Sequence, residues 1–173
     1  MKIHVINKDK ISDVDINETV IRVKALIINS NNEFLLGYSH GTYQFPGGHI
    51  ELGEELNLGL KRELLEETGI EFDTKDLEPF FLIKEYIKDY DSLGNNKLLL
   101  IYYYIINSDK LYQLDKTSYT LWETSGNFSL EYVHINNINK VLEESIPLNP
   151  INKIIVQEMT LALNEYKLLN QDK

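Results

Sequence analysis

The sequence contains no cysteine, which excludes disulfide bonds, thiolate nucleophiles and zinc sites built on cysteine. It is also poor in basic charge, with 17 Lys and Arg against 27 Asp and Glu and a formal net charge of −10. A chain without a basic stripe or a polybasic tail has little electrostatic attraction to nucleic acid polymers or anionic membranes, so we expect neither as a partner. No apolar run has the length of a membrane span or a secretion signal, and a cytoplasmic location is expected.

The composition that remains is typical of one folded domain. An apolar fraction of 43% over 173 residues is enough to bury a substantial core, and we see no linker, repeat or low-complexity tract. We therefore expect a single domain over residues 1–173. Small domains with long hairpins often pair, so a homodimer is also expected.

The most informative segment is 48–70, where Glu63, Glu66 and Glu67 stand at i, i+3 and i+4. In a helix these carboxylates project from one side and repel one another, so a positive partner is needed. A hard divalent cation with oxygen ligands fits that need. Most acidic helix faces are simply solvated, and a lone cluster of this kind would be weak evidence for a metal.

The neighbours of the acids strengthen the prediction of a helix with two different sides. Leu56, Leu60 and Leu64 repeat every four residues and form an apolar stripe beside the acidic one. Gly69 is placed as the left-handed residue that ends the helix. One side of the helix should therefore pack while the other faces a ligand.

This segment resembles the signature box of the Nudix hydrolases, G-x5-E-x7-R-E-U-x-E-E-x-G-U, in which U is a bulky aliphatic residue. Every defined position is filled in register: Gly48, Glu54, Arg62, Glu63, Leu64, Glu66, Glu67, Gly69 and Ile70. The approach to the box, residues 43–48, is also similar to the family's strand. The rest of the chain shares only the order of elements.

The resemblance implies a fold, an activity and a metal. The fold is an α/β/α sandwich with a mixed sheet between the box helix and a C-terminal helix. The activity is hydrolysis of a phosphoanhydride bond in a nucleoside diphosphate linked to another group, with Mg²⁺ or Mn²⁺. Such ions would also reconcile an acidic protein with a small anionic nucleotide as its partner.

Roles carry over from the family to matching positions. Glu66 and Glu67 would be metal ligands, the carbonyl of Gly47 would be another, and Glu63 would be a third ligand or the general base. Arg62 would orient a box carboxylate, either Glu63 or Glu54. Gly48, Glu54 and Gly69 would be structural.

The general base has candidates outside the box as well. Glu131 resembles the position of a later acid that many members use, and Glu123 is the competing choice; a solvated acid at a strand end is the alternative reading of Glu131. Among the histidines, His49 stands beside the glycine pair and could touch a phosphate, but a solvent-facing loop residue is the more common situation.

Hydrophobic periodicity predicts the remaining elements. Expected strands cover 18–29 and 33–38, joined as a hairpin, 80–90 and 97–107, joined as another, and 128–135. Within them, 98–106 should be a central strand covered on both faces. A short helix is expected at 138–144, and a long C-terminal helix with Asn149 as its N-cap and Pro150 at its first position. Residues 108–128 should be either a substrate-facing loop or a short helix.

The substrate depends on residues outside the box. Tyr43 and Tyr86, and with them Tyr38 and Tyr103, offer flat surfaces for stacking on a base. Tyr86 stands where the diadenosine polyphosphate subgroup often has a tyrosine, whereas Glu85 stands where many ADP-ribose enzymes have a proline. The leading substrates are nucleoside triphosphates or their oxidised forms, with dinucleoside polyphosphates, nucleotide sugars and ADP-ribose as alternatives.

Two other classes share the fold. A nucleotide-sensing module without catalysis usually has lost box acids, and all of them are present here. The isopentenyl diphosphate isomerase branch needs a catalytic cysteine, and this chain has none. Hydrolysis is therefore the preferred function.

Overall fold

A mixed seven-stranded sheet forms the centre of the protein, in a computed structural model that describes residues 1–171. The strand order is β1-β5-β6-β2-β3-β4, and β7 also pairs with β3. The strands are β1 Lys2–Ile6, β2 Ile16–Ile28, β3 Glu33–Ser39, β4 Thr42–Gln44, β5 Phe81–Ile87, β6 Asn96–Asn107 and β7 Ser129–His134. The helices are α1 Leu56–Thr68, α2 Leu121–Ser125, α3 Ile138–Ser145 and α4 Asn152–Gln171.

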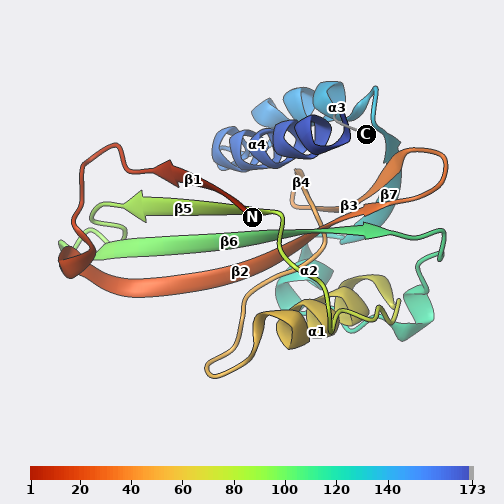
Figure 1. Cartoon of the computed structure of the whole chain (residues 1–173), viewed down its shortest axis with the longest axis horizontal. Coiled ribbons are helices and arrows are strands. Elements are labelled where there is room, and N and C mark those ends of the chain that lie inside the picture. The colour runs from red at the N-terminus through yellow and green to blue at the C-terminus, as the bar shows by residue number, and fades with distance from the viewer. Residues whose placement is uncertain (172–173) are drawn as a thin grey trace.

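Helices cover both faces of the sheet, which confirms the expected α/β/α sandwich (Figure 1). Helix α1 lies against one face, and α3 and α4 lie together against the other. Strand β2 supplies both cores because successive side chains point to opposite faces. Val23, Ala25 and Ile27 pack in the core under α1, whereas Leu26 and Ile28 pack in the core under α4.

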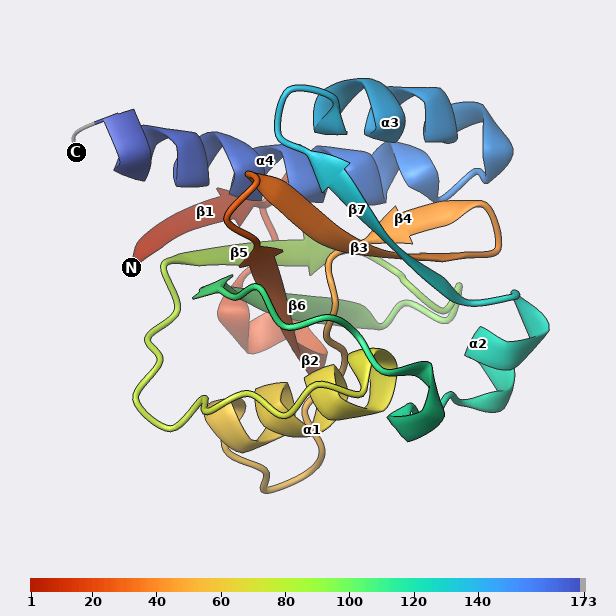
Figure 2. The same ribbon diagram turned by 90° about the vertical axis from the view of Figure 1, so that its right-hand side faces the viewer.

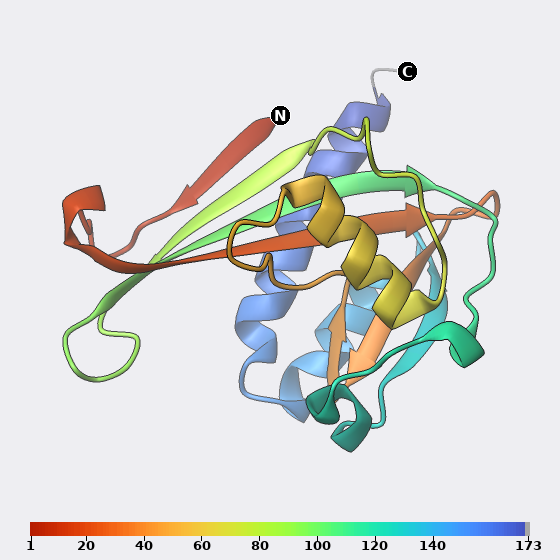
Figure 3. The same ribbon diagram turned by 90° about the horizontal axis from the view of Figure 1, so that it is seen from below.

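The predicted central strand and the hairpin of β5 with β6 are present, whereas β2 and β3 form the other predicted hairpin through a single pair. Strand β6 pairs in parallel with β2 and antiparallel with β5, and this places 98–106 inside the sheet. The ends of β2, β5 and β6 reach beyond the helices as an extended arm (Figure 3). Strand β1 was not expected; it pairs in parallel with β5, and its residues Ile3 and Val5 are exposed.

The sheet splits next to the box, and this split positions the site. Strands β2 and β3 share a single pair, Ile28 with Phe34, and then diverge. The chain that follows β4 fills the gap along β2. Ala25 N donates to Pro46 O at 2.9 Å, and Val23 N donates to Gly48 O at 2.9 Å. Gly47 and Gly48 are thereby held in the middle of the sheet, facing α1.

The C-terminal helix begins later than the sequence indicates. Asn149 has extended backbone, and its side chain accepts a hydrogen bond from Ile151 N at 3.2 Å, so it forms a turn before the helix. Helix α4 then starts at Asn152, whose buried side chain bonds to Thr42, Gly41 and Ser145. Those bonds fix the first turn of α4 to the β3–β4 hairpin.

Residues 108–128 are mostly irregular; a short 3-10 turn, Leu114–Lys116, lies next to α1, and the short helix α2 follows farther along the segment (Figure 2). Among residues 1–171, no helix combines the length and the apolarity that crossing a membrane requires.

Candidate active site

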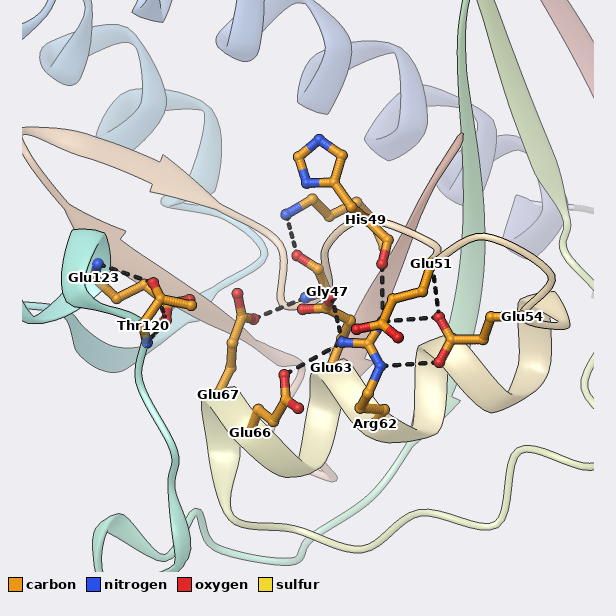
Figure 4. A network of polar contacts seen from close by, with 11 residues as sticks. Gly47, His49, Glu51, Glu54, Arg62, Glu63, Glu66, Glu67, Thr120 and Glu123 are labelled. Atoms are coloured by element: carbon orange, nitrogen blue, oxygen red, sulfur yellow. Dashed lines mark hydrogen bonds and ion pairs between the residues drawn. The ribbon is translucent and has the colours of Figure 1, made fainter. Parts of the chain in front are cut away.

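Helix α1 presents the box acids as the spacing predicts. Leu60 and Leu64 are fully buried against the sheet and fix the rotation of the helix. Gly69 ends it in the left-handed conformation, with φ of 67° and its N–H bonded to Leu65 O. Glu63 and Glu67 consequently project toward the glycine loop (Figure 4).

Arg62 joins the loop to the helix, and it contacts both carboxylates that the sequence offered as alternatives. Its Nε and Nη2 donate to the two Glu54 oxygens at 2.9 and 2.8 Å, while Nη1 donates to Glu63 Oε1 at 2.8 Å. Nη2 also bonds to His49 O at 2.9 Å, and Nη1 lies 3.3 Å from Glu66 Oε2. Planar, bidentate pairing of this kind is strong and geometrically specific. It lowers the pKa of the Glu54 carboxyl, which stays ionised as a structural anchor.

Glu67 is the buried acid of the cluster, only 9% exposed. Its Oε2 accepts a hydrogen bond from Gly47 N at 2.8 Å. Burial raises the pKa of this carboxyl, although nearby Lys24 and the Gly47 amide oppose the shift. Gly47 has φ of 125°, and a Cβ there would lie 2.2 Å from Val23 O, so only glycine fits.

Gly48 lies close to the Glu63 carboxylate. A Cβ on Gly48 would stand 2.3 Å from Glu63 Oε2, inside any permitted contact. Burial raises the pKa of Glu63, and Arg62 acts in the opposite direction. The two glycines therefore allow the loop to approach two carboxylates closely.

The site also has a basic side that the sequence analysis missed. Lys24 Nζ donates to Gly47 O at 2.5 Å and to Gln44 Oε1 at 3.1 Å. Burial lowers the pKa of this lysine. Arg22 Nε lies 3.1 Å from His49 Nε2, and burial next to Arg22 lowers the pKa of His49 to about 4. A charged residue in the middle of an apolar strand was the available signal for Lys24.

These groups line one cavity of about 380 Å³. Its walls include the box acids Glu63 and Glu67. They also include Glu123, one of the two candidates for a general base outside the box. Glu123 also completes the N-terminal cap of α2, since its carboxylate accepts from Thr120 N at 2.6 Å while its own N–H donates to Thr120 Oγ1 at 3.2 Å. Glu123 thus lines the cavity from α2 while Thr120 binds one of its carboxylate oxygens (Figure 4).

Glu131 lies elsewhere. It pairs with Leu36 in the β3–β7 ladder, and Leu36 belongs to the core under α4. Leu130, the preceding residue, belongs to the core under α1. Because side chains alternate along a strand, Glu131 is on the face opposite the box helix, where it is exposed next to Tyr43. The geometry does not bring this acid to Glu63 or Glu67.

Neither predicted substrate tyrosine lines the cavity. Tyr43 packs against Tyr38 with the two rings tilted and their centroids 4.6 Å apart, and burial beside Glu131 raises its pKa to about 12. Tyr86 is on the extended arm, where its hydroxyl donates to Asp13 at 2.6 Å.

The aromatic group at the mouth of the cavity is instead Trp122, stacked on His40 with ring centroids 4.1 Å apart. Tyr103, another of the predicted stacking residues, is buried in the core under α4.

The segment that carries α2 is tied to the box helix by backbone bonds. Gln113 N donates to Thr68 O at 2.8 Å, and Ser118 N donates to Glu66 O at 2.9 Å. These bonds satisfy carbonyls that the end of a helix leaves free. A Cβ on Gly69 would lie 2.1 Å from Gln113 O, so the contact also depends on glycine.

The donor set suits a hard divalent cation. Carboxylate oxygens of Glu63, Glu66 and Glu67 and the carbonyl of Gly47 are the ligands that Mg²⁺ and Mn²⁺ prefer. Within residues 1–171, no three carboxylates or imidazoles already converge on one point. Arg62 instead holds Glu63, and Lys24 holds the Gly47 carbonyl, so cationic side chains neutralise the same oxygens.

Comparison with known families matches residues 18–138 to the NUDIX domain. Among solved structures, a MutT protein from Bacillus halodurans is similar, with a TM-score of 0.52, 20% identity, and coverage of 70% of this chain and 72% of that one. A MutT NUDIX hydrolase from Burkholderia pseudomallei gives a TM-score of 0.50 at 14% identity, covering 68% of this chain and 84% of that one. At these identities the structural likeness concerns the fold.

Proposed function

This chain belongs to the Nudix hydrolase family, and we propose that it cleaves a phosphoanhydride bond in a nucleoside triphosphate, or an oxidised one, with the help of Mg²⁺ or Mn²⁺. One observation carries the proposal. Glu63, Glu66 and Glu67 project from one helix beside the glycine loop, and Glu63 and Glu67 share a cavity with Glu123. Burying carboxylates that repel one another is costly, and a role in binding cations explains why the fold bears that cost.

The residues divide into a binding set and an orienting set. Glu66, Glu67 and the Gly47 carbonyl would hold the metal, with Glu63 as a further ligand. When bound, the cation withdraws charge from phosphoryl oxygens. Arg62 keeps Glu63 at the loop through its 2.8 Å bond, and its bidentate bond to Glu54 anchors that arrangement.

Glu123 is the general base that the geometry favours. It enters the cavity from α2, so water between α2 and α1 could lose its proton to this carboxylate as it attacks phosphorus. Glu131 was the first expectation, but its place on the opposite face of the sheet does not support that role. Glu63 is the alternative within the box.

The dinucleoside polyphosphate alternative loses its supporting residue. Tyr86 is engaged with Asp13 on the extended arm and does not line the cavity. Nucleotide sugars and ADP-ribose, and a sensing role without catalysis, remain alternatives to be separated by assay. The cytoplasmic location and the homodimer stay predictions.

A substrate panel tests the proposal. Nucleoside triphosphates, oxidised dGTP, ADP-ribose, dinucleoside polyphosphates and nucleotide sugars would each be incubated with Mg²⁺ or Mn²⁺ and their products separated. We expect turnover of triphosphates, and a fall in kcat of about two orders of magnitude or more in Glu67→Gln. Glu71→Gln is the control, because Glu71 is exposed and pairs with Lys61 away from the cavity. No turnover across the panel, or full turnover by Glu67→Gln, would contradict the proposal.

A further inference from the structure

Lys24 is an unusual residue for its position. It stands between Val23 and Ala25, both fully buried, in the strand that supplies both cores. Its side chain points to the α4 side of β2 but reaches the glycine loop, where Nζ donates to Gly47 O at 2.5 Å. The N–H of the same glycine donates to Glu67 Oε2 at 2.8 Å, so Gly47 joins Lys24 to this carboxylate, whose charge attracts the ammonium.

The oxygen that Lys24 binds is the one assigned above to a divalent cation, so this inference rests on the proposed function. Mg²⁺ binds oxygen at about 2.0–2.1 Å. An ion at that distance from Gly47 O would lie no more than about 4.6 Å from an ammonium bonded to the same oxygen at 2.5 Å, and charges of like sign repel strongly at such a distance in a partly buried site. The carbonyl oxygen has two lone pairs, so the two cations compete through their mutual repulsion rather than for a single acceptor position.

We propose that Lys24 is the counter-cation of the metal-free site, which it stabilises by holding the Gly47 carbonyl and neutralising Glu67, and that a divalent cation must displace it. Lys24 is then a positioning residue that sets the affinity for metal. Its ammonium offsets part of the repulsion among the carboxylates before the metal arrives, on the Glu67 side of the cluster, while Arg62 does so at Glu63. The same contact weakens metal binding by contributing an opposing charge.

Binding of Mn²⁺ to the full chain tests this without catalysis. Free Mn²⁺ is followed by electron paramagnetic resonance during titration, with circular dichroism as the check on folding. We expect Lys24→Met to bind Mn²⁺ about tenfold more tightly than wild type, because the competing charge is gone. Lys24→Arg, which keeps a cation, should bind like wild type. Lys61→Met is the matched control. It also removes one lysine, but that lysine lies on the outside of α1, where it pairs with Glu71.

The outcomes separate this inference from the function it rests on. Equal or weaker Mn²⁺ binding by folded Lys24→Met, with Glu67→Gln still reducing it, would overturn the role of Lys24 alone. If wild type binds no Mn²⁺ at all, the proposed metal site itself fails. Should Lys24→Met fold poorly, Lys24→Gln keeps an amide donor for Gly47, removes the charge and carries the same expectation. An equal gain in Mn²⁺ affinity in Lys61→Met would show that the effect comes from net charge alone. That result would also overturn the proposed role of Lys24.

Discussion

We predict different effects on kcat for Glu123→Gln and Glu131→Gln. The sequence alone could not decide which of these two acids belongs to the site. Glu123 faces the cavity that holds Glu63 and Glu67, whereas Glu131 is exposed on the other side of the sheet. A positioned general base contributes about 10²- to 10⁴-fold, or about 2.7–5.5 kcal/mol of transition-state free energy. We expect Glu123→Gln to lower kcat within that range, and Glu131→Gln to stay within about twofold of wild type.

Glu123→Gln should leave the fold unchanged because glutamine can also occupy this position of a helix cap. The bond from Thr120 N at 2.6 Å can pass to the glutamine amide oxygen, so α2 should stay in place. Losing the cap would otherwise cost about 1 kcal/mol of stability. The two variants can therefore be compared at equal fold, with thermal unfolding as the check.

The assay is the pH dependence of kcat with saturating Mg²⁺ and the best substrate of the panel. Loss of the acidic limb of the profile in Glu123→Gln would identify the base, whereas a structural residue would lower activity without removing a limb. A loss of two orders of magnitude in Glu131→Gln, with Glu123→Gln near wild type, would refute the placement of the site between α1 and α2.

Three further predictions concern stability and packing. Glu158 on α4 has a pKa raised by burial from 4.5 to about 7, so folding favours its protonated form; the stability it contributes is present below pH 4.5 and is lost as pH rises through 7. Glu158→Gln should therefore raise the free energy of unfolding by about 2 kcal/mol at pH 8 and by almost nothing at pH 4, as measured in urea. An equal gain at both pH values would contradict the assignment. Gly48→Ala should abolish most activity, because its Cβ would stand 2.3 Å from Glu63 Oε2, and near-normal kcat would show that the loop can move away. Asn152→Ala should cost about 2–4 kcal/mol in thermal or urea unfolding, since Thr42, Gly41 and Ser145 would each lose a buried partner; a loss under 1 kcal/mol would mean that water replaces the side chain.

The parts of the site that depend on short spacing could be predicted from the sequence. Glu63, Glu66 and Glu67 share a side of α1 because helical geometry fixes residues three and four apart, and Gly69 ends the helix for a local conformational reason. Arg62 contacts Glu54 and Glu63 because all three belong to the same contiguous segment. These inferences needed no knowledge of how distant segments meet.

The remainder depends on which distant residues become neighbours. Glu123 and Glu131 are both acids after the box. Only the register of β7 on β3 determines that Glu131 faces away from the box helix. Strand β1 pairs in parallel with β5, far along the chain, and the alternation in its short sequence gives no guide to burial because the apolar residues Ile3 and Val5 are the exposed ones. Lys24 looks like one more charge in a strand, two residues after Arg22, until Gly47 is placed beside it.

The bonds from Gln113 and Ser118 to the last turn of α1 have a consequence for engineering. Transplanting the segment that carries Trp122 and Glu123 from a relative, in order to change substrate preference, would require residues 113–118 to keep donating to Thr68 and Glu66. A graft that begins at residue 119 preserves those two bonds, whereas one that begins at 108 places them at risk. The boundary of an exchangeable module in this enzyme therefore lies after Ser118, within what the sequence presents as one continuous loop.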